Sequence, residues 1–238
     1  MFRSWRRAEI VGLCLIMLLG ALLVTSALQQ ISPAPPAPVY FVPGSPSEVA
    51  ITFETFWSSE GLEEVLRILR EKDVRATFFL TGAWLKNHPE AAKMILEQGH
   101  EIGNHTMNHA GLLYLTEEEI RNEIDGFIEA AQEILEFRPV LFRPPQGLYN
   151  GIVLQHAWKR RCRTVLWSVE SYDYLSRDAA ELIARVGSRL QGGAIILFRA
   201  GTPVTLEALP QILELLREQG YSPVTVSALL DNLDRPAG

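Results

Sequence analysis

From Val49 onward, short apolar runs alternate with segments whose apolar residues recur at helical spacing, and this alternation constrains the fold most. The runs read VAITF, RATFFL, VLFR, TVLWSV, AIILF and SPVTV. Uninterrupted apolar strands joined by amphipathic helices are typical of a parallel sheet covered on both faces. The length holds about seven such strand–helix units, which favours an incomplete or distorted barrel over a complete eight-fold one.

The segments between these runs carry helix signals. Leu62 and Leu66 belong to an apolar face with period 3.6, and Thr116 and Glu119 have the spacing of a capping box. We therefore predict one α/β domain over residues 49–238.

The N-terminus carries an apolar segment preceded by basic residues. Residues 10–28 contain no charged side chain, and about 20 such residues cross a bilayer as a helix. Arg3, Arg6 and Arg7 precede the segment, and basic flanks remain in the cytoplasm. We expect a cytoplasmic flank at 1–9, a single-pass transmembrane helix at 10–28, and an extracytoplasmic domain held at the cell membrane. A cleaved signal peptide and a buried core helix are the alternatives.

Residues 29–48 are rich in proline and read QQISPAPPAPVYFVPGSPSE. Proline fixes φ and removes a backbone donor, so this composition predicts an extended, semi-rigid linker between the membrane and the domain.

The net charge excludes one class of partner. The 238 residues carry a formal charge of −6, which provides no basic surface for nucleic acid. The two cysteines, Cys14 and Cys162, lie far apart in the sequence and do not indicate a disulfide framework.

Polar and titratable residues follow the predicted strands. In a parallel α/β fold the carboxyl ends of the strands meet at one edge, where active sites lie. The residues found there are Glu54, His105, His109, Arg143, Glu170, Asp173 and Arg199.

At these positions the chain resembles the polysaccharide deacetylases, the NodB-homology or carbohydrate esterase family 4 domain. The matching stretches are VRATFFLTGAWLKNHPEAAKMILEQGHEIGNHTMNH, LFRPPQG and EALPQILELLREQGYSPVTVSALL. The resemblance runs from about Val49 to Leu233. It implies a distorted (β/α)7-type barrel that removes acetyl groups from N-acetylated glycans such as peptidoglycan. It also implies a divalent metal, often zinc, held by one aspartate and two histidines.

The resemblance assigns roles to individual residues. Glu54 would be the general base, and His105 and His109 would be metal ligands. The four-residue spacing of the histidines is that of one side of a helical turn. Arg143 would orient the catalytic carboxylate, and Asp173 would support a catalytic histidine. Alternatively, the two histidines are retained for packing and Arg143 forms a structural salt bridge with Asp173.

Three motif positions would contact substrate: Pro144, Gly147 and Leu197. The motif that contains Leu197 ends in Arg199, where the family has its proton-donating histidine. A guanidinium has a pKa above about 12 and cannot cycle a proton near neutral pH. Arg199 would either stabilise an oxyanion electrostatically, or pair with Asp173 or Glu54 and fill the site.

The first motif departs from the family at the metal ligand. The family's Thr-Phe-Asp-Asp-Gly reads Thr52-Phe53-Glu54-Thr55-Phe56, so a neutral hydroxyl replaces the ligand carboxylate. Hydroxyls are poor ligands for zinc and similar ions. A divalent metal would therefore be weakly held, unless Glu54 moves in as the third ligand.

These departures leave three hypotheses. The first is a cell-surface deacetylase of N-acetylated glycan whose hydrolysis is weak or lost. The second is a non-catalytic pseudoenzyme that binds glycan or a partner protein. The third is a structural protein of the cell envelope.

Overall fold

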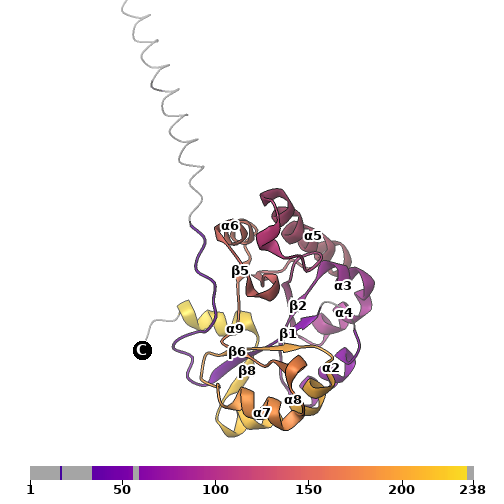
Figure 1. Cartoon of the computed structure of the whole chain (residues 1–238), viewed down its shortest axis with the longest axis vertical. Coiled ribbons are helices and arrows are strands. Elements are labelled where there is room, and N and C mark those ends of the chain that lie inside the picture. The colour runs from indigo at the N-terminus through magenta and orange to yellow at the C-terminus, as the bar shows by residue number, and fades with distance from the viewer. Residues whose placement is uncertain (1–16, 18–33, 56–58, 235–238) are drawn as a thin grey trace, which may run out of the picture. The chain divides into compact units, whose positions relative to one another are not determined.

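The structure is a computed structural model that describes residue 17 and residues 34–55 and 59–234 (Figure 1). The chain divides into two units, residues 1–35 and residues 36–238. Apart from Met17, the predicted transmembrane helix at 10–28 lies outside the described residues, as does the basic flank at 1–9. Within the described part of the chain, no helix combines the length and the apolar character that crossing a bilayer requires.

The larger unit is built on one parallel sheet. The strand order is β5-β4-β3-β2-β1-β7-β6, and β8 pairs with β1 beside this path. All pairings are parallel, and β5 and β6 form the two ends of the path. The predicted parallel α/β fold is thus confirmed in the form of a curled, open half-barrel. The strands are β1 Glu48–Thr55, β2 Thr77–Leu80, β3 Glu101–Asn104, β4 Leu141–Phe142, β5 Arg163–Thr164, β6 Val169–Glu170, β7 Ile195–Arg199 and β8 Ser222–Val224.

Helices surround this sheet, as Figure 1 shows. The α-helices are α2 Leu62–Glu71, α3 Gly82–Asn87, α4 Pro89–Glu97, α5 Glu117–Leu135, α6 Gly151–Lys159, α7 Ala179–Gly187, α8 Pro203–Glu218 and α9 Val226–Leu230. The short 3₁₀ turns are η1 Leu112–Tyr114, η2 Pro145–Gly147, η3 Asp173–Leu175 and η4 Asp231–Asp234. Helix α5 begins with the predicted capping box between Thr116 and Glu119.

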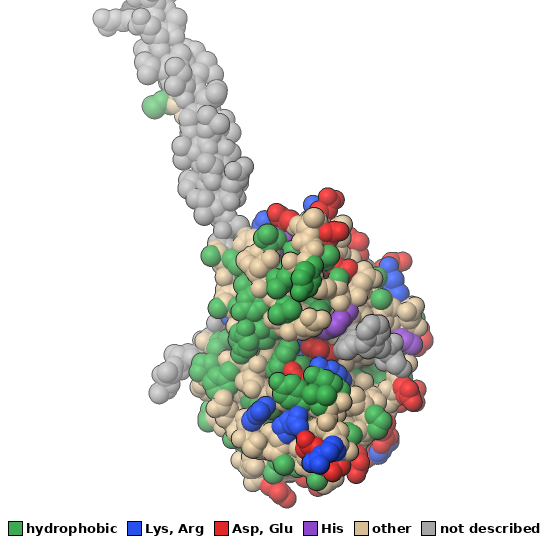
Figure 2. Space-filling view, in the orientation of Figure 1, with side chains coloured by type: hydrophobic (Ala, Val, Ile, Leu, Met, Phe, Trp, Pro, Cys, Tyr) green, Lys and Arg blue, Asp and Glu red, His purple; other side chains and the backbone are tan. Residues whose placement is uncertain are grey.

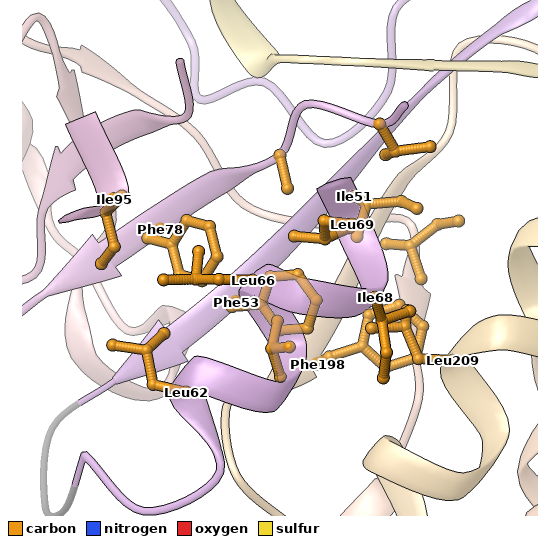
Figure 3. Packing of buried hydrophobic residues seen from close by; sticks show 14 of the residues in the cluster. Ile51, Phe53, Leu62, Leu66, Ile68, Leu69, Phe78, Ile95, Phe198 and Leu209 are labelled. Carbon is orange, nitrogen blue, oxygen red and sulfur yellow. The ribbon is translucent and has the colours of Figure 1, made fainter. Parts of the chain in front are cut away.

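A layer of three phenylalanines fixes the register of the central strands. Phe53 of β1 pairs with Phe78 of β2 and with Phe198 of β7, and the ring centroids lie 5.0 and 5.8 Å from that of Phe53. These rings pack under α2 and α8, against Leu66 and Leu209 among others (Figure 3). Since successive side chains point to opposite faces of a strand, the next residues of β1 and β7 face the inside of the curled sheet.

A segment that precedes β1 bonds to the end of β5 and to the residues just before β7. The Val39 N–H donates to the Thr164 carbonyl at 3.0 Å, and the Val42 N–H donates to the Gly193 carbonyl at 2.9 Å. Val39 and Val42 are both buried. The compact unit therefore begins at Pro36, inside the span 29–48 that the sequence indicates as a linker.

Candidate active site

The predicted site residues come from the carboxyl ends of five strands. Glu54 of β1 lies directly opposite Arg199 of β7. His105 follows β3, Arg143 follows β4, and Asp173 opens the turn after β6. Figure 2 shows acidic, basic and histidine side chains close together in a hollow of one face. The predicted meeting of these residues at one edge of the sheet is what the structure shows.

The side chain of Arg143 is held by three hydrogen bonds and by an aromatic ring. Its Nη1 donates to Thr52 Oγ1 at 2.9 Å, and Nη2 donates to the Leu166 carbonyl at 3.0 Å. Its Nε donates to the Val165 carbonyl at 3.3 Å, and the guanidinium lies 4.0 Å from the centre of the Phe79 ring. Burial lowers the pKa of Arg143 to about 10, so this fully buried group stays cationic at neutral pH.

Glu54 lies between this arginine and the first histidine. Its Oε1 is 3.7 Å from Arg143 Nη1, and its Oε2 is 3.8 Å from His105 Nε2. Burial raises the pKa of Glu54 more than the charges of Arg143 and Arg199 lower it, so the net shift is upward. Arg143 therefore pairs with Glu54 and, among the described residues, forms no ion pair with Asp173.

The two histidines meet, but not on a helical turn. Their ring centroids are 5.0 Å apart, yet Thr106 and His109 have φ values of 70° and 58°. Left-handed backbone at residues other than glycine is uncommon and concentrates at functional sites. The expected helical turn is therefore wrong. The side chain of Thr106 helps to hold the bend, since its Oγ1 accepts the His109 N–H at 3.0 Å.

Both histidines are neutral at physiological pH. Burial lowers the pKa of His105 to about 3 and that of His109 to about 4. The Nδ1 of His105 lies 2.8 Å from the Arg143 carbonyl, which can only accept, so Nδ1 carries the proton. Nε2 then presents its lone pair toward Glu54, in the tautomer that metal ligands use.

Asp173 is buried and accepts several hydrogen bonds. Its Oδ2 accepts the Arg199 N–H at 2.6 Å and the Thr205 hydroxyl at 2.8 Å. Its Oδ1 accepts the Tyr174 N–H at 2.9 Å. The strand-end rule does not select Thr205, because this residue lies in the first turn of α8 and its spacing resembles that of a packing residue.

Arg199 occupies the end of β7 and is tied to two carboxylates. Its Nη1 lies 3.3 Å from Asp173 Oδ1 and 3.2 Å from Glu170 Oε1. The guanidinium also lies 4.1 Å from the centre of the Tyr174 ring. Burial lowers the pKa of Arg199, but the carboxylates of Asp173, Glu170 and Glu54 outweigh it, so the net shift is upward. The pairing with Asp173 that the sequence leaves open is confirmed, and Glu170 adds a second partner.

The donor set does not fit a tightly held metal. Among the described residues, no group of three His, Cys, Asp or Glu side chains is placed to hold an ion. At the expected third ligand, Thr55 is buried, and within the described structure its hydroxyl has no hydrogen-bond partner. A neutral hydroxyl beside two imidazoles leaves the charge of a divalent ion uncompensated.

The three predicted substrate-contact residues differ in place and exposure: Pro144 and Gly147 follow β4, whereas Leu197 lies in the middle of β7. Leu197 and Pro144 are buried, and the Leu197 carbonyl accepts the Ser171 N–H at 3.2 Å. Gly147 is partly exposed and has a φ of 69°. A Cβ on Gly147 would lie 3.0 Å from the Trp167 ring, so this glycine permits a close packing of the loop on that ring.

Comparison with known proteins gives the family. Residues 42–165 match the family described as polysaccharide deacetylase. The peptidoglycan-N-acetylglucosamine deacetylase of Bacillus cereus is 36% identical over 195 residues, which cover 79% of this chain and 91% of that protein. The uncharacterized protein YlxY of Bacillus subtilis is 35% identical over 198 residues, or 82% of this chain. The matched part is 61% of YlxY, less than two thirds of its length.

Solved structures agree with this result. BA3943 of Bacillus anthracis, described as a CE4 family pseudoenzyme, superimposes with a TM-score of 0.80 at 33% identity. The match covers 86% of this chain and 72% of that chain. A mutant of BA3943 with restored enzymatic activity gives the same TM-score. The family match, the identity to the Bacillus cereus deacetylase over most of its length and the shared fold lead to one conclusion. This chain belongs to the polysaccharide deacetylase family.

Proposed function

We propose that this chain is a membrane-anchored, extracytoplasmic member of the family that binds N-acetylated cell-wall glycan such as peptidoglycan. Its amide hydrolysis is weak or lost, and any divalent metal is weakly held. The observation that supports the proposal is the pairing of Arg199 with two carboxylates. By the resemblance to the family, Arg199 would replace the proton-donating histidine, and its guanidinium forms ion pairs with Glu170 and Asp173.

The chemistry of amide hydrolysis explains why an arginine at position 199 matters. The leaving amine needs a proton in the transition state, a contribution of about 10²–10⁴-fold in rate. Arg199 cannot deliver that proton because its pKa is shifted upward by the carboxylates around it. Glu54 would act as the base, but the next residue, Thr55, carries no carboxylate that could bind a metal.

The proposed ligand class rests on the relatives. The similar proteins include a peptidoglycan-N-acetylglucosamine deacetylase and a peptidoglycan-N-acetylmuramic acid deacetylase. In this chain the rim keeps exposed aromatic surface beside the charged groups. Tyr174 is 53% exposed and Tyr172 is 37% exposed, and their ring centroids are 6.3 Å apart. Exposed tyrosines of this kind offer apolar area together with a polar tip for a sugar ring.

The proposed location rests on the sequence of the N-terminal part. The uncharged residues 10–28 have the length of a bilayer-spanning helix, and Arg3, Arg6 and Arg7 favour a cytoplasmic N-terminus. A domain that begins at Pro36 would then lie outside the cell, next to its proposed ligand. Protease added to intact cells should release a fragment that begins near residues 29–35. Full protection of the domain would contradict this location.

Co-sedimentation with insoluble peptidoglycan tests the ligand. The full chain, purified in mild detergent, should co-sediment, and Tyr174→Ala should weaken binding by roughly tenfold through the loss of apolar contact area. Tyr114→Ala is the matched control, since Tyr114 is an even more exposed tyrosine, at 88%, on the turn η1. Absence of co-sedimentation, or equal losses in both variants, would argue against a glycan site at this rim.

A further inference from the structure

The rim contains three largely buried carboxylates, and neutral hydrogen-bond donors alone do not balance their negative charge. The carboxylates of Glu54, Glu170 and Asp173 lie together, with side-chain exposures of 5%, 12% and 0%. Burial of a carboxylate costs several kcal/mol unless an opposite charge lies close to it. A cationic group among the three carboxylates therefore stabilises the folded domain.

Arg143 supplies only part of this charge. Three of its hydrogen bonds go to neutral acceptors, namely Thr52 Oγ1 and the carbonyls of Val165 and Leu166. Within the described structure, its one ion-pair partner is Glu54. Arg143 thus fixes and compensates the carboxylate of β1. Its charge also acts on Glu170, but within the described structure it forms no ion pair with Glu170 or Asp173.

Arg199 supplies the remaining positive charge at the rim. Its Nη1 contacts both Glu170 and Asp173, and its strand position is directly opposite Glu54. Its charge also acts on Glu54, so this one guanidinium interacts with all three carboxylates. Meanwhile the position expected to hold a metal-ligand carboxylate carries the neutral Thr55.

We propose that the guanidinium of Arg199 replaces the charge of a divalent ion at this rim, so that the domain is stable without a resident metal and a metal is repelled. The proposal rests on the proposed function only in taking the rim as the ligand site. Like charges a few Å apart repel strongly in a partly desolvated site. Loss of the ligand at Thr55 and gain of a cation at Arg199 therefore act together against metal binding.

Repulsion by Arg199 predicts a result that differs from the result expected if only the ligand at position 55 were missing. If Thr55 were the only obstacle, Thr55→Asp would restore zinc binding by itself. With Arg199 as a competing cation, Thr55→Asp should bind zinc weakly. Thr55→Asp combined with Arg199→Gln should bind zinc about tenfold or more tightly than Thr55→Asp alone. Glutamine removes the charge while it adds no good zinc ligand.

The chain offers a matched control in Arg185. Its side chain is 23% exposed, close to the 25% of Arg199, and it also pairs with a carboxylate, that of Glu181. Its guanidinium likewise lies near a tyrosine, 5.5 Å from the Tyr172 ring centre. Arg185→Gln in the Thr55→Asp background changes the net charge equally and should leave zinc affinity unchanged.

Zinc affinity is measured on the full chain in mild detergent by competition with a chromogenic chelator. Equal affinity of Thr55→Asp and Thr55→Asp/Arg199→Gln would overturn the proposal, and so would an equal gain from Arg185→Gln. No glycan is present and no acetate is measured, so the result is independent of the test of the proposed function.

Thermal unfolding gives a second measurement that does not need Thr55→Asp. In the chain with Thr55 retained and chelator present, Arg199→Gln should lower Tm by several degrees, because Glu170 and Asp173 lose their counter-charge. Arg185→Gln should lower Tm much less, since Glu181 is more exposed. Equal Tm values for the two variants would show that the rim does not depend on the charge of Arg199, and would sink the proposal.

Discussion

Arg199 and Glu54 occupy directly opposed positions on the paired strands β7 and β1, which places a permanent cation beside the buried carboxylate at the proposed base position. The same arginine is held by Asp173, whose Oδ2 accepts its backbone N–H at 2.6 Å. A residue bound through both its backbone and its side chain is a fixed part of the site. The ion pairs of Arg199 with Glu170 and Asp173 therefore fix its guanidinium at this end of β7.

The buried guanidinium of Arg143 should dominate the stability of the rim. Arg143→Met should lower the free energy of unfolding by roughly 3–5 kcal/mol, because Glu54 is left buried without its cation and two carbonyls lose their donors. Urea unfolding measures this loss. Arg67→Met is the control. Arg67 is 44% exposed in its ion pairs, so its loss should cost much less than the loss of Arg143. Equal losses would contradict a special role for Arg143.

Gly103 should be required for the support behind Arg143. A Cβ at this position in β3 would lie 2.4 Å from the Phe79 ring, and that ring carries the Arg143 guanidinium at 4.0 Å. Gly103→Ala should therefore displace Phe79 and cost about 1–3 kcal/mol in urea unfolding. Gly151→Ala is the control, because no atom lies within 4 Å of its Cβ position. If Gly103→Ala left the free energy of unfolding unchanged, Phe79 would be shown to move freely.

His100 should make stability depend on pH. Burial lowers its pKa from 6.5 to about 4, with a further contribution from the charge of Arg75. The unfolded chain therefore takes up a proton first as pH falls, so the contribution of His100 is fully present above about pH 6.5. It is lost progressively as pH falls toward 4. Each pH unit in this window removes on the order of 1 kcal/mol of the free energy of unfolding.

The variant that tests this is His100→Asn. The His100 Nδ1 accepts the Ala76 N–H at 3.2 Å, and an asparagine carbonyl can accept the same bond without titrating. Unfolding free energies measured between pH 7 and 4 should fall less steeply for His100→Asn than for the unaltered chain. Parallel pH profiles would rule out His100 as the source of this acid sensitivity.

The sequence predicts the scaffold well because local and long-range signals agree. The apolar runs of β1, β2 and β7 become the central strands, and the phenylalanine of each run lies in one layer. The capping box of Thr116 and Glu119 starts α5 where expected. The rule that strand ends meet at one edge also brings Glu54 and Arg199 together correctly.

Contacts made across the fold escape this reasoning. Val39 and Val42 lie in a proline-rich stretch, so composition indicates a linker, although both are buried and their backbones bond to Thr164 of β5 and to Gly193 before β7. The spacing of His105 and His109 suits a helix, whereas the chain turns through left-handed backbone at His109. The role of Thr205 depends on a hydrogen bond to Asp173 across the fold, which no periodicity encodes.

Acetate release tests the central claim most directly. The full chain in mild detergent is incubated with peptidoglycan or chitin oligomers and added zinc or cobalt, beside the Bacillus cereus deacetylase as reference. We predict release at least about 10²-fold below the reference, with no further decrease in His105→Ala. Release at the rate of the reference enzyme, abolished by His105→Ala, would contradict a site closed by Arg199.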